Sequence, residues 1–492
     1  QIHSKASFYK TKQDDFYGSL KQNYVDALFV NFPFVLLSHI KFFNSLISND
    51  KEDNYLLHRL ANSVFIIDEL QSYSPSEWDK LSYLINHFSE SLNITFVLMS
   101  ATLPKISKLL TDAKLDKFIY LVPNKHDYFN NPNFADRVVF NFDYLNKELF
   151  AFSNESIVDI VIKHSEEYFT KSNKVHTLIE FVTKKSAKSF YEHIRNIDKL
   201  KEYELLFIDG TVLEPRRIEI IEYLKSKEKA NKIIIVATQV IEAGLNLDMD
   251  IGFKDISILD SEEQFAGRIN RNANKMHSTV YLFNSDNSKH VYKNDLRFIE
   301  QKKIPPNDLY QILKEKKFDD YYSYVFSNIT KYNNSLFSEN ISSFINYLKT
   351  LKFWDARNNF KLIESKTISV FVPLAIDHQY FSTSELEYLT QMHINANSNY
   401  EIDGEEVFEF YTKLISTKII NNDFLSKKAE IKMLSAIMSK FVFNSYFNEN
   451  FINVLRHYGE ERFGYFYLSN WRKVYSYQDG LKSDLESDCN FL

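Results

Sequence analysis

The chain has 492 residues and a formal net charge of -6, with 44% hydrophobic and 25% charged residues. This length exceeds what one hydrophobic core holds, so we expect roughly 2 to 4 domains. The slightly acidic balance excludes a passive coat that binds nucleic acid through overall basic charge, so any such contact must be local. The single cysteine, Cys489, excludes an internal disulfide framework and a cysteine-rich zinc site. We find no signal peptide and no membrane-spanning apolar run, and we expect a cytoplasmic protein without a membrane partner.

The first part of the chain, residues 1–145, is expected to form an incomplete α/β domain. β-branched and aromatic residues alternate with stretches of helical apolar spacing, which is typical of strand-helix units. A polar stretch rich in Asn and Pro precedes the boundary, which we place near residue 145. Strands are predicted at 63–68, 94–99 and 138–142, with helices that begin near Trp78 and Ile106.

The second part, residues 146–292, alternates cleanly between strands and helices. Such alternation implies crossover connections and a parallel sheet covered on both faces, with functional groups beyond the carboxyl ends of the strands. The third part, residues 293–492, contains amphipathic helical stretches with interleaved Tyr and Phe, and we predict a mostly helical C-terminal domain. In the second part, strands are predicted at 176–182, 204–208, 232–237, 256–259 and 279–283, with helices at 156–168, 184–194 and 214–224 and from 262.

The apolar run at 64–67 ends in a carboxylate pair, Asp68 and Glu69. Magnesium held by phosphate oxygens needs only one or two carboxylates, and Asp68 is placed to supply one. Glu69 is then placed to orient the water that attacks a terminal phosphate, or to accept its proton. By itself the pair also fits an acidic surface turn at the end of a strand.

A second run of small polar residues, Ser100, Ala101 and Thr102, follows the next predicted strand. The two hydroxyl groups can bond both the preceding carboxylates and a passing phosphodiester, which would couple hydrolysis to movement. The alternative is an ordinary helix N-cap ahead of Pro104, a role that suits Thr102.

Two further motifs follow the strongest predicted strand. Thr238 and Gln239 stand at its tip with helix-start amides that suit a nucleic-acid phosphate, and Gly244 permits close backbone approach. Further on, Gln264, Arg268 and Arg271 are spaced i, i+4 and i+7, which predicts one face of a helix. Two guanidinium groups there suit the charge that develops on a transferred phosphoryl group, although a solvated basic face is the alternative.

Taken in order, these four motifs resemble the superfamily 2 helicases, and their detailed forms resemble the CRISPR-associated helicase of type I interference systems. The resemblance covers residues 20–290 strongly. It implies two RecA-like domains, the first incomplete, which use ATP and Mg²⁺ to translocate along single-stranded DNA after recruitment by an RNA-guided surveillance complex. The implied roles are Asp68 as the magnesium ligand, Glu69 as the catalytic base, Gln264 and Arg268 as phosphate sensors, Arg271 as the arginine finger, and Ser100, Thr102, Thr238 and Gln239 as groups that link the nucleotide to the DNA.

Part of the family pattern is missing. No glycine is followed by lysine, so the phosphate-binding loop G-x-x-x-x-G-K-S/T is absent from this sequence. Because the chain also begins with Gln1, we expect it to be a segment of a longer protein whose front end carries the phosphate-binding loop and an HD nuclease domain. The lone pair His126 and Asp127 is too small a ligand set for such a nuclease, and Asn246 stands where relatives usually have Asp.

Basic and aromatic residues outside the motifs are weaker candidates. Lysines and arginines could line a DNA groove or merely face solvent. Aromatics of the third part could stack on bases, but core packing is the commoner role. The basic candidates are Lys184, Lys185, Lys188, Arg216 and Arg217, and the aromatic ones are Trp354, Tyr465, Phe466, Tyr467 and Trp471.

We therefore expect the ATP-dependent DNA helicase part of a type I CRISPR effector, which degrades target DNA together with a nuclease domain outside this segment. Two alternatives remain open. One is another superfamily 2 motor on DNA or RNA. The other is a module that binds DNA or a partner without hydrolysis, because the phosphate-binding loop is missing. Alone, the segment is expected to hydrolyse little ATP.

Overall fold

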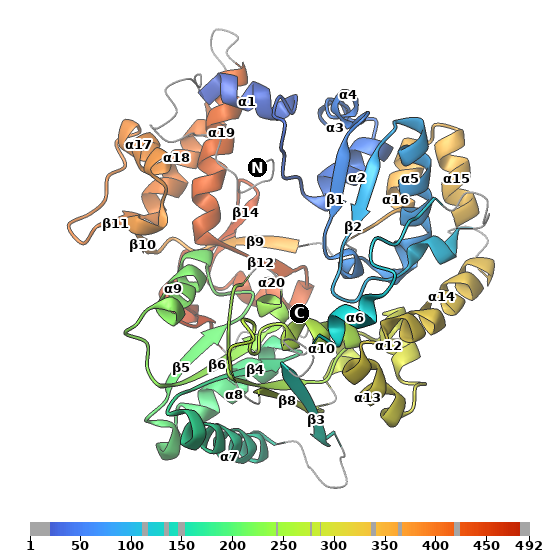
Figure 1. The fold of residues 1–492 in the computed structure, drawn as a ribbon. Helices are drawn as coiled ribbons and strands as arrows, with labels where there is room; N and C mark the ends of the chain where they lie inside the picture. Colours follow the sequence, from blue (N-terminus) through green and yellow to red (C-terminus); the bar gives the residue numbers. More distant parts are fainter. Residues whose placement is uncertain are drawn as a thin grey trace.

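The computed structural model describes residues 20–482, except 111–116, 132–136, 146–152, 243–244, 276–277, 286, 336–340, 363–366 and 418–423. The chain is organised around two separate parallel sheets, with a largely helical region after them (Figure 1). The predicted α/β class, with parallel sheets followed by a mostly helical region, is confirmed. We refer to residues 20–131 as the first lobe and to residues 137–285 as the second lobe.

The second lobe contains a six-stranded parallel sheet in the order β3-β8-β7-β4-β6-β5. Strand β4 is buried along its whole length and β6 along nearly all of it, as expected for a parallel sheet covered on both faces. Helices α7 and α8 cover one face, and α9 and α10 contribute to the cluster on the other. The elements are β3 (Val138–Tyr144), α7 (Asn154–Ser172), β4 (Val175–Phe181), α8 (Lys184–Ile194), η5 (Asp198–Leu200), β5 (Glu204–Ile208), α9 (Glu214–Lys225), β6 (Lys232–Thr238), η6 (Gln239–Ile241), β7 (Ile251–Asp255), α10 (Leu259–Ala266) and β8 (Ser278–Phe283).

The first lobe has a two-stranded parallel sheet, β1-β2, with α5 between its strands. Val64 and Ile66 on β1 are 65% and 66% exposed, although parallel strands are normally buried on both faces. One face of this small sheet is therefore uncovered by the described residues. The elements are α1 (Leu20–Leu28), α2 (His39–Ile47), α3 (Lys51–Asn54), α4 (Leu57–Leu60), β1 (Val64–Ile67), η1 (Leu70–Ser72), η2 (Pro75–Glu77), α5 (Trp78–Ser91), β2 (Thr95–Leu98), η3 (Ile106–Leu109) and α6 (Lys125–Phe129).

A group of helices follows the second lobe, in which α13 contacts β3, α12 and α14 contact the η2 segment, and α15 and α16 lie beside α5 of the first lobe (Figure 1). Their apolar side chains share one hydrophobic cluster with residues of both lobes, so these helices help to hold the lobes together. The elements of this group are α11 (Ser288–Val291), α12 (Leu296–Gln301), α13 (Pro306–Glu315), α14 (Phe318–Ser335), α15 (Ile341–Lys349) and α16 (Phe353–Asn359).

A separate C-terminal unit has its own hydrophobic cluster. It is mainly helical but also contains the four-stranded sheet β12-β9-β14-β13, which the sequence reading did not include. Its elements are β9 (Thr367–Phe371), β10 (Ala375–Asp377), η7 (His378–Tyr380), α17 (Thr383–Gln391), β11 (Glu401–Asp403), α18 (Gly404–Ser416), α19 (Phe424–Met438), η8 (Ser439–Phe441), β12 (Val442–Tyr446), α20 (Glu449–Leu455), β13 (Glu460–Arg462), β14 (Tyr465–Tyr467), α21 (Trp471–Val474), β15 (Tyr475–Ser476) and β16 (Gly480–Leu481).

One predicted strand and the predicted domain boundary differ from the structure. The strand expected at 256–259 lies earlier, as β7 (Ile251–Asp255), and Leu259 begins α10. The charged residues Lys254 and Asp255 interrupt its apolar pattern, although both are fully buried, Lys254 bonded to Glu242 and Asp255 to Ser285. Strand β3 pairs with β8, so the sheet of the second lobe starts before the boundary expected near residue 145.

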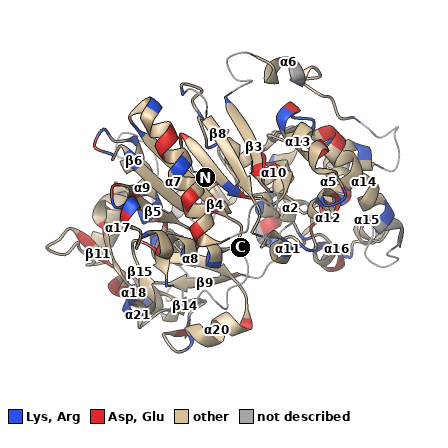
Figure 2. Ribbon diagram, turned by 90° about the horizontal axis from the view of Figure 1, so that it is seen from below, with Lys and Arg blue, Asp and Glu red and all other residues tan. Residues whose placement is uncertain are grey.

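Charged side chains of both signs are spread over the helices, whereas the strands of the large sheet carry few (Figure 2). This pattern fits the small net charge of the chain. Among the helices that the structure describes, none is both long and apolar enough to cross a bilayer.

Candidate functional site

The candidate site lies where the first lobe meets the second, and it begins at the end of β1. Asp68 is exposed, and its Oδ1 accepts a hydrogen bond from the backbone N–H of Glu69 at 2.9 Å. Glu69 has φ 54° and ψ 45°, the left-handed region that non-glycine residues seldom occupy. Such conformations cluster at functional sites, where surrounding contacts hold them. Here the bonds of the Glu69 carboxylate provide those contacts.

Glu69 is bonded from both lobes. The side-chain amide of Gln264 in α10 donates to Glu69 Oε2 at 3.2 Å, and the amide of Gln71 donates to the same oxygen. Burial and the neighbouring Arg271 lower the pKa of Arg268, while Glu242 and Glu69 oppose that shift, so Arg268 lies within electrostatic reach of Glu69. The structure thus brings together Glu69, Gln264 and Arg268.

Arg268 and Arg271 do not lie on a continued helix, which corrects the predicted helical face. Helix α10 ends at Ala266, because Ile269 pairs with Met249 beside the sheet and Asn270 turns left-handed, with φ 45°. The Arg268 guanidinium donates to the carbonyl oxygen of Glu242. Arg271 is exposed, and within the described ranges its side chain forms no ion pair.

Asp248 fixes the segment that follows α10. Its carboxylate accepts from the Arg271 backbone N–H at 2.9 Å and from the Asn272 amide at 2.7 Å, and it forms an ion pair with Lys275 at 2.8 Å. Asn246 is exposed and touches none of these groups in the described part of the chain. Asp248 therefore acts as an anchor for the arginine segment, a contact that the sequence did not reveal.

Ser100 and Thr102 both bond within the protein. The Ser100 hydroxyl donates to the side-chain oxygen of Gln71, and Thr102 Oγ1 donates to Asp260 at 2.5 Å. Thr102 is buried and caps no helix, because η3 begins after Lys105. The Ser100 bond lies within the first lobe, whereas the Thr102 bond joins the two lobes and leaves Thr102 closed to a phosphodiester.

A buried charged cluster lies next to the segment that contains Arg268 and Arg271. Lys254 on β7 is fully buried and bonds the carboxylate of Glu180 on β4, that of Glu242 at 3.1 Å and the hydroxyl of Ser261 at 2.9 Å. Although burial opposes its charge, these carboxylates raise the pKa of Lys254 well above its usual value. Burial and the charge of Glu242 raise the pKa of Glu180. The cluster fixes Glu242, and the backbone carbonyl of Glu242 accepts the hydrogen bond from Arg268.

Sequence reasoning missed Glu180 and Lys254. Each is a single charged residue inside an apolar strand pattern. Because a buried charge must be paired, such a residue predicts an oppositely charged partner nearby. It also missed His39, whose pKa is lowered by burial while the nearby Asp68 opposes the shift.

A second feature is a cavity of about 340 Å³ at the carboxyl ends of the large sheet. Lys184, Gly210 and Thr238, which follow three neighbouring strands, form one wall, and Asn444 and Ser445 of the C-terminal unit form part of the other. Lys184 is 3% exposed, and no carboxylate in the described ranges pairs with its ammonium group. The cavity therefore presents a positive charge beside hydroxyl and amide groups.

Most other basic candidates are occupied elsewhere. Lys188 donates to the carbonyl of Asp479 at 2.7 Å, Arg216 pairs with Glu219 at 3.1 Å, and Arg217 donates to the carbonyl of Val212 at 2.8 Å. Lys185 is exposed. Of the aromatic candidates, Phe466 and Tyr467 are buried in β14, Tyr465 and Trp471 are partly buried, and Trp354 is 75% exposed.

A larger cavity, of about 820 Å³, lies at the amino ends of β4, β7 and β8, on the other edge of the sheet. It contains none of the predicted catalytic groups, although Asn246 and Asp248 border it. We assign the chemistry to the interlobe site because the carboxylate, amide and guanidinium groups converge there.

The residues present suit a magnesium ion that takes one carboxylate ligand from the protein and its other ligands from phosphate and water. Asp68 offers one exposed carboxylate, and no group of three or more His, Cys, Asp or Glu ligands is present in the described part of the chain. Such an ion would supply positive charge to a bound phosphate, and Asp68 would hold it. Gly244 and the side chain of His126 fall outside what the structure describes.

Residues 173–274 match the family described as CRISPR-associated nuclease/helicase Cas3, C-terminal. The resemblance to the Cas3 family is confirmed. A CRISPR-associated nuclease/helicase Cas3 protein of Methanocaldococcus jannaschii is 26% identical over 244 residues, which are 46% of this chain and 29% of that protein. The Cas3 protein of Methanothermobacter thermautotrophicus is 25% identical over 225 residues, 42% of this chain and 24% of that protein.

The matched Cas3-like part thus spans less than a third of these curated relatives. Among solved structures, the crystal structure of T. fusca Cas3 with AMPPNP is similar at a TM-score of 0.49 and 14% identity, covering 90% of this chain and 53% of that one.

Proposed function

We propose that this chain is the helicase part of a Cas3-type effector, in which ATP hydrolysis at the interlobe site drives movement along single-stranded DNA. The bond from Gln264 to Glu69 carries this proposal, because it brings a residue of the second lobe to the base of the first. A triphosphate bound between the lobes would therefore meet Asp68 and Glu69 on one side and Gln264 and Arg268 on the other. Arg271 lies within electrostatic reach of Arg268, and we propose that it joins them when a triphosphate binds.

Glu69→Gln tests the catalytic assignment. It keeps the size and the capacity to bond Gln264 but removes the base, so hydrolysis should fall by about 10²-fold to 10⁴-fold. The measurement is single-stranded-DNA-stimulated ATP hydrolysis by the protein translated from the longest reading frame that contains these residues. Undiminished turnover in Glu69→Gln would refute the role of Glu69.

We further propose that the Lys184 cavity binds a phosphate of the DNA strand. Its support is a nearly buried ammonium group without an acidic partner in the described part, beside the Thr238 hydroxyl. Lys184→Met should weaken binding of a single-stranded oligonucleotide and lower the magnitude of the salt slope by about 1. Lys185→Met on the same helix is the matched control, because that side chain is exposed.

The phosphate-binding half is proposed to pack on the small sheet of the first lobe. The uncovered apolar side chains of Val64 and Ile66 support this, since parallel strands are usually covered. Sequencing the DNA immediately upstream of the codon for Gln1 tests whether such a segment is continuous with this chain. The 492-residue chain alone should hydrolyse little ATP, and micromolar nucleotide binding by it would contradict that expectation.

Comparison of activators separates the proposed motor from its relatives. Stimulation by single-stranded DNA but not RNA, together with binding to an RNA-guided surveillance complex and a linked nuclease, is the expected result. Preference for RNA would place the chain among other superfamily 2 motors. DNA binding without hydrolysis in any combination of chains would favour a binding module.

A further inference from the structure

A buried polar cluster joins three parts of the chain close to the interlobe site. It consists of Thr102 from the first lobe, Asp260 from α10, and Arg297 and Tyr322 from helices α12 and α14. We call these four residues the interlobe cluster. All four are buried, so their polar groups need hydrogen-bond partners within the protein.

Asp260 is the centre of this cluster. Its Oδ1 accepts from Thr102 at 2.5 Å and from the hydroxyl of Tyr322, and its Oδ2 lies 3.7 Å from the guanidinium of Arg297. Groups from the first lobe and from the returning helices therefore meet at one carboxylate of the second lobe. A change in the spacing between the lobes must break these bonds.

Arg297 extends the cluster to the loop that carries the base. Its Nη1 donates to the carbonyl oxygen of Gln71 at 2.6 Å, while Asp295 holds Nη2 at 2.7 Å and Nε at 3.0 Å. The guanidinium also lies 6.0 Å from the ring of Trp78, which is fully buried. A planar, forked cation can serve these partners together, which a lysine cannot do.

Gln71 connects Arg297 to Glu69 through hydrogen bonds. Its side-chain amide donates to Glu69, its side-chain oxygen accepts from Ser100, and its backbone carbonyl is bound by Arg297. We propose that Arg297 is a positioning residue that fixes the Gln71–Glu69 loop while Asp260 holds the lobes together. No motif recognised in the sequence contains Arg297 or Tyr322, and the catalytic meaning of this inference rests on the proposed function.

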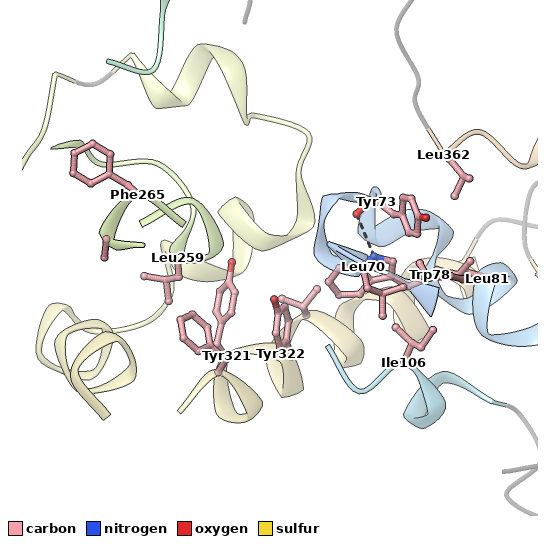
Figure 3. Packing of buried hydrophobic residues seen from close by; sticks show 14 of the residues in the cluster. Leu70, Tyr73, Trp78, Leu81, Ile106, Leu259, Phe265, Tyr321, Tyr322 and Leu362 are labelled. Carbon is pink, nitrogen blue, oxygen red and sulfur yellow. Dashed lines mark hydrogen bonds between the residues drawn. The ribbon is translucent and has the colours of Figure 1, made fainter. Parts of the chain in front are cut away.

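Two adjacent tyrosines provide a matched pair for the test. Figure 3 shows Tyr321 and Tyr322 between Leu259 of the second lobe and Leu70 and Trp78 of the first. Both rings are buried, but only the Tyr322 hydroxyl bonds Asp260, and that of Tyr321 has no hydrogen-bond partner in the described part. Tyr322→Phe therefore removes a cluster bond, whereas Tyr321→Phe removes a hydroxyl without one.

Hydrogen exchange of the full 492-residue chain measures the positioning directly. The amides of Leu70 and Ser72 are bonded in the loop, to Met99 and Glu69. In Arg297→Lys they should exchange about 10-fold to 100-fold faster, since a hydrogen bond to a charged group shifts an opening equilibrium by that factor. A smaller acceleration is expected in Tyr322→Phe and none in Tyr321→Phe, while β4 and β6 keep their protection in all three.

The outcomes are distinct. Equal loop protection in Arg297→Lys and the parent chain would overturn the proposal, as would faster exchange throughout β4 and β6, which would indicate a general structural role. In the ATP-hydrolysing protein, Arg297→Lys should lower kcat without changing KM for ATP. If the parent protein hydrolyses no ATP, the proposed function fails, and the exchange result still decides the positioning of the loop.

Discussion

Replacing Lys254 by methionine removes the cation that balances two buried carboxylates. Lys254 and Glu180 are both fully buried, and Glu242 is 8% exposed, so water cannot replace the lost ammonium group. Removing one partner of a buried ion pair costs about 3 to 5 kcal/mol, because the other charge stays buried without compensation. We expect Lys254→Met to destabilise β4 and β7 by that amount, and to loosen the Glu242 carbonyl that holds Arg268.

The free energy of unfolding that Lys254→Met loses should increase with pH. Burial and Glu242 raise the pKa of Glu180, so the folded chain binds the proton of Glu180 more tightly than the unfolded chain does. The resulting stabilisation is complete below the ordinary pKa of glutamate and declines as the pH rises through the folded value. Because Lys254 opposes the rise in the Glu180 pKa, its removal raises that pKa further and extends this decline to higher pH. The variant should therefore lose more stability at pH 8 than at pH 5.

Hydrogen exchange of β4 and β7 at the two pH values reports the local free energy of opening. Lys185→Met is the control, since its exposed side chain should contribute less than about 0.5 kcal/mol. Adding Glu180→Leu to Lys254→Met should restore part of the loss, because it removes a stranded carboxylate. A loss below about 1 kcal/mol at both pH values, or no recovery in the double variant, would refute this reasoning.

Two further predictions concern the same face of the sheet. A Cβ at position 252 would lie 2.6 Å from the ring of Phe265, so Gly252→Ala should cost about 1 to 3 kcal/mol in thermal unfolding. Gly210→Ala, where the nearest atom is at 3.4 Å, should be nearly neutral, and equal losses would contradict the packing argument. Burial raises the pKa of Glu262 to about 7, so its stabilising contribution is full below about 4.5 and is lost as the pH rises through 7. Glu262→Gln should flatten the stability profile over that range in urea unfolding, and an unchanged slope would show that Glu262 does not titrate there.

Much of the second lobe could be predicted from local sequence alone. The apolar runs at β4 and β6 and the helical spacing of α8 and α9 are strong because both faces of a parallel sheet are covered. The order of the carboxylate, hydroxyl and arginine motifs likewise carried the resemblance to the Cas3 family. Such signals are local, since each depends only on side chains a few residues apart.

Other features depend on residues far apart in the chain. Helix α10 stops at Ala266 because Ile269 and Arg271 bond the segment of Met249 and Asp248, which spacing alone does not reveal. Lys254 reads as a polar break in a strand until Glu180 supplies its counter-charge across the sheet.

The sequence by itself determined the parallel α/β class, the resemblance to the Cas3 family and the residue types of the candidate site. Only the tertiary structure decided that Gln264 reaches Glu69, that Asp260 joins the lobes and that Arg297 grips the loop between them. The physical reason is that the hydrophobic periodicity of a sequence indicates only which side chains face a core. Pairing of buried polar groups, by contrast, depends on three-dimensional packing between distant segments, such as those of Gln71 and Arg297, which are 226 residues apart.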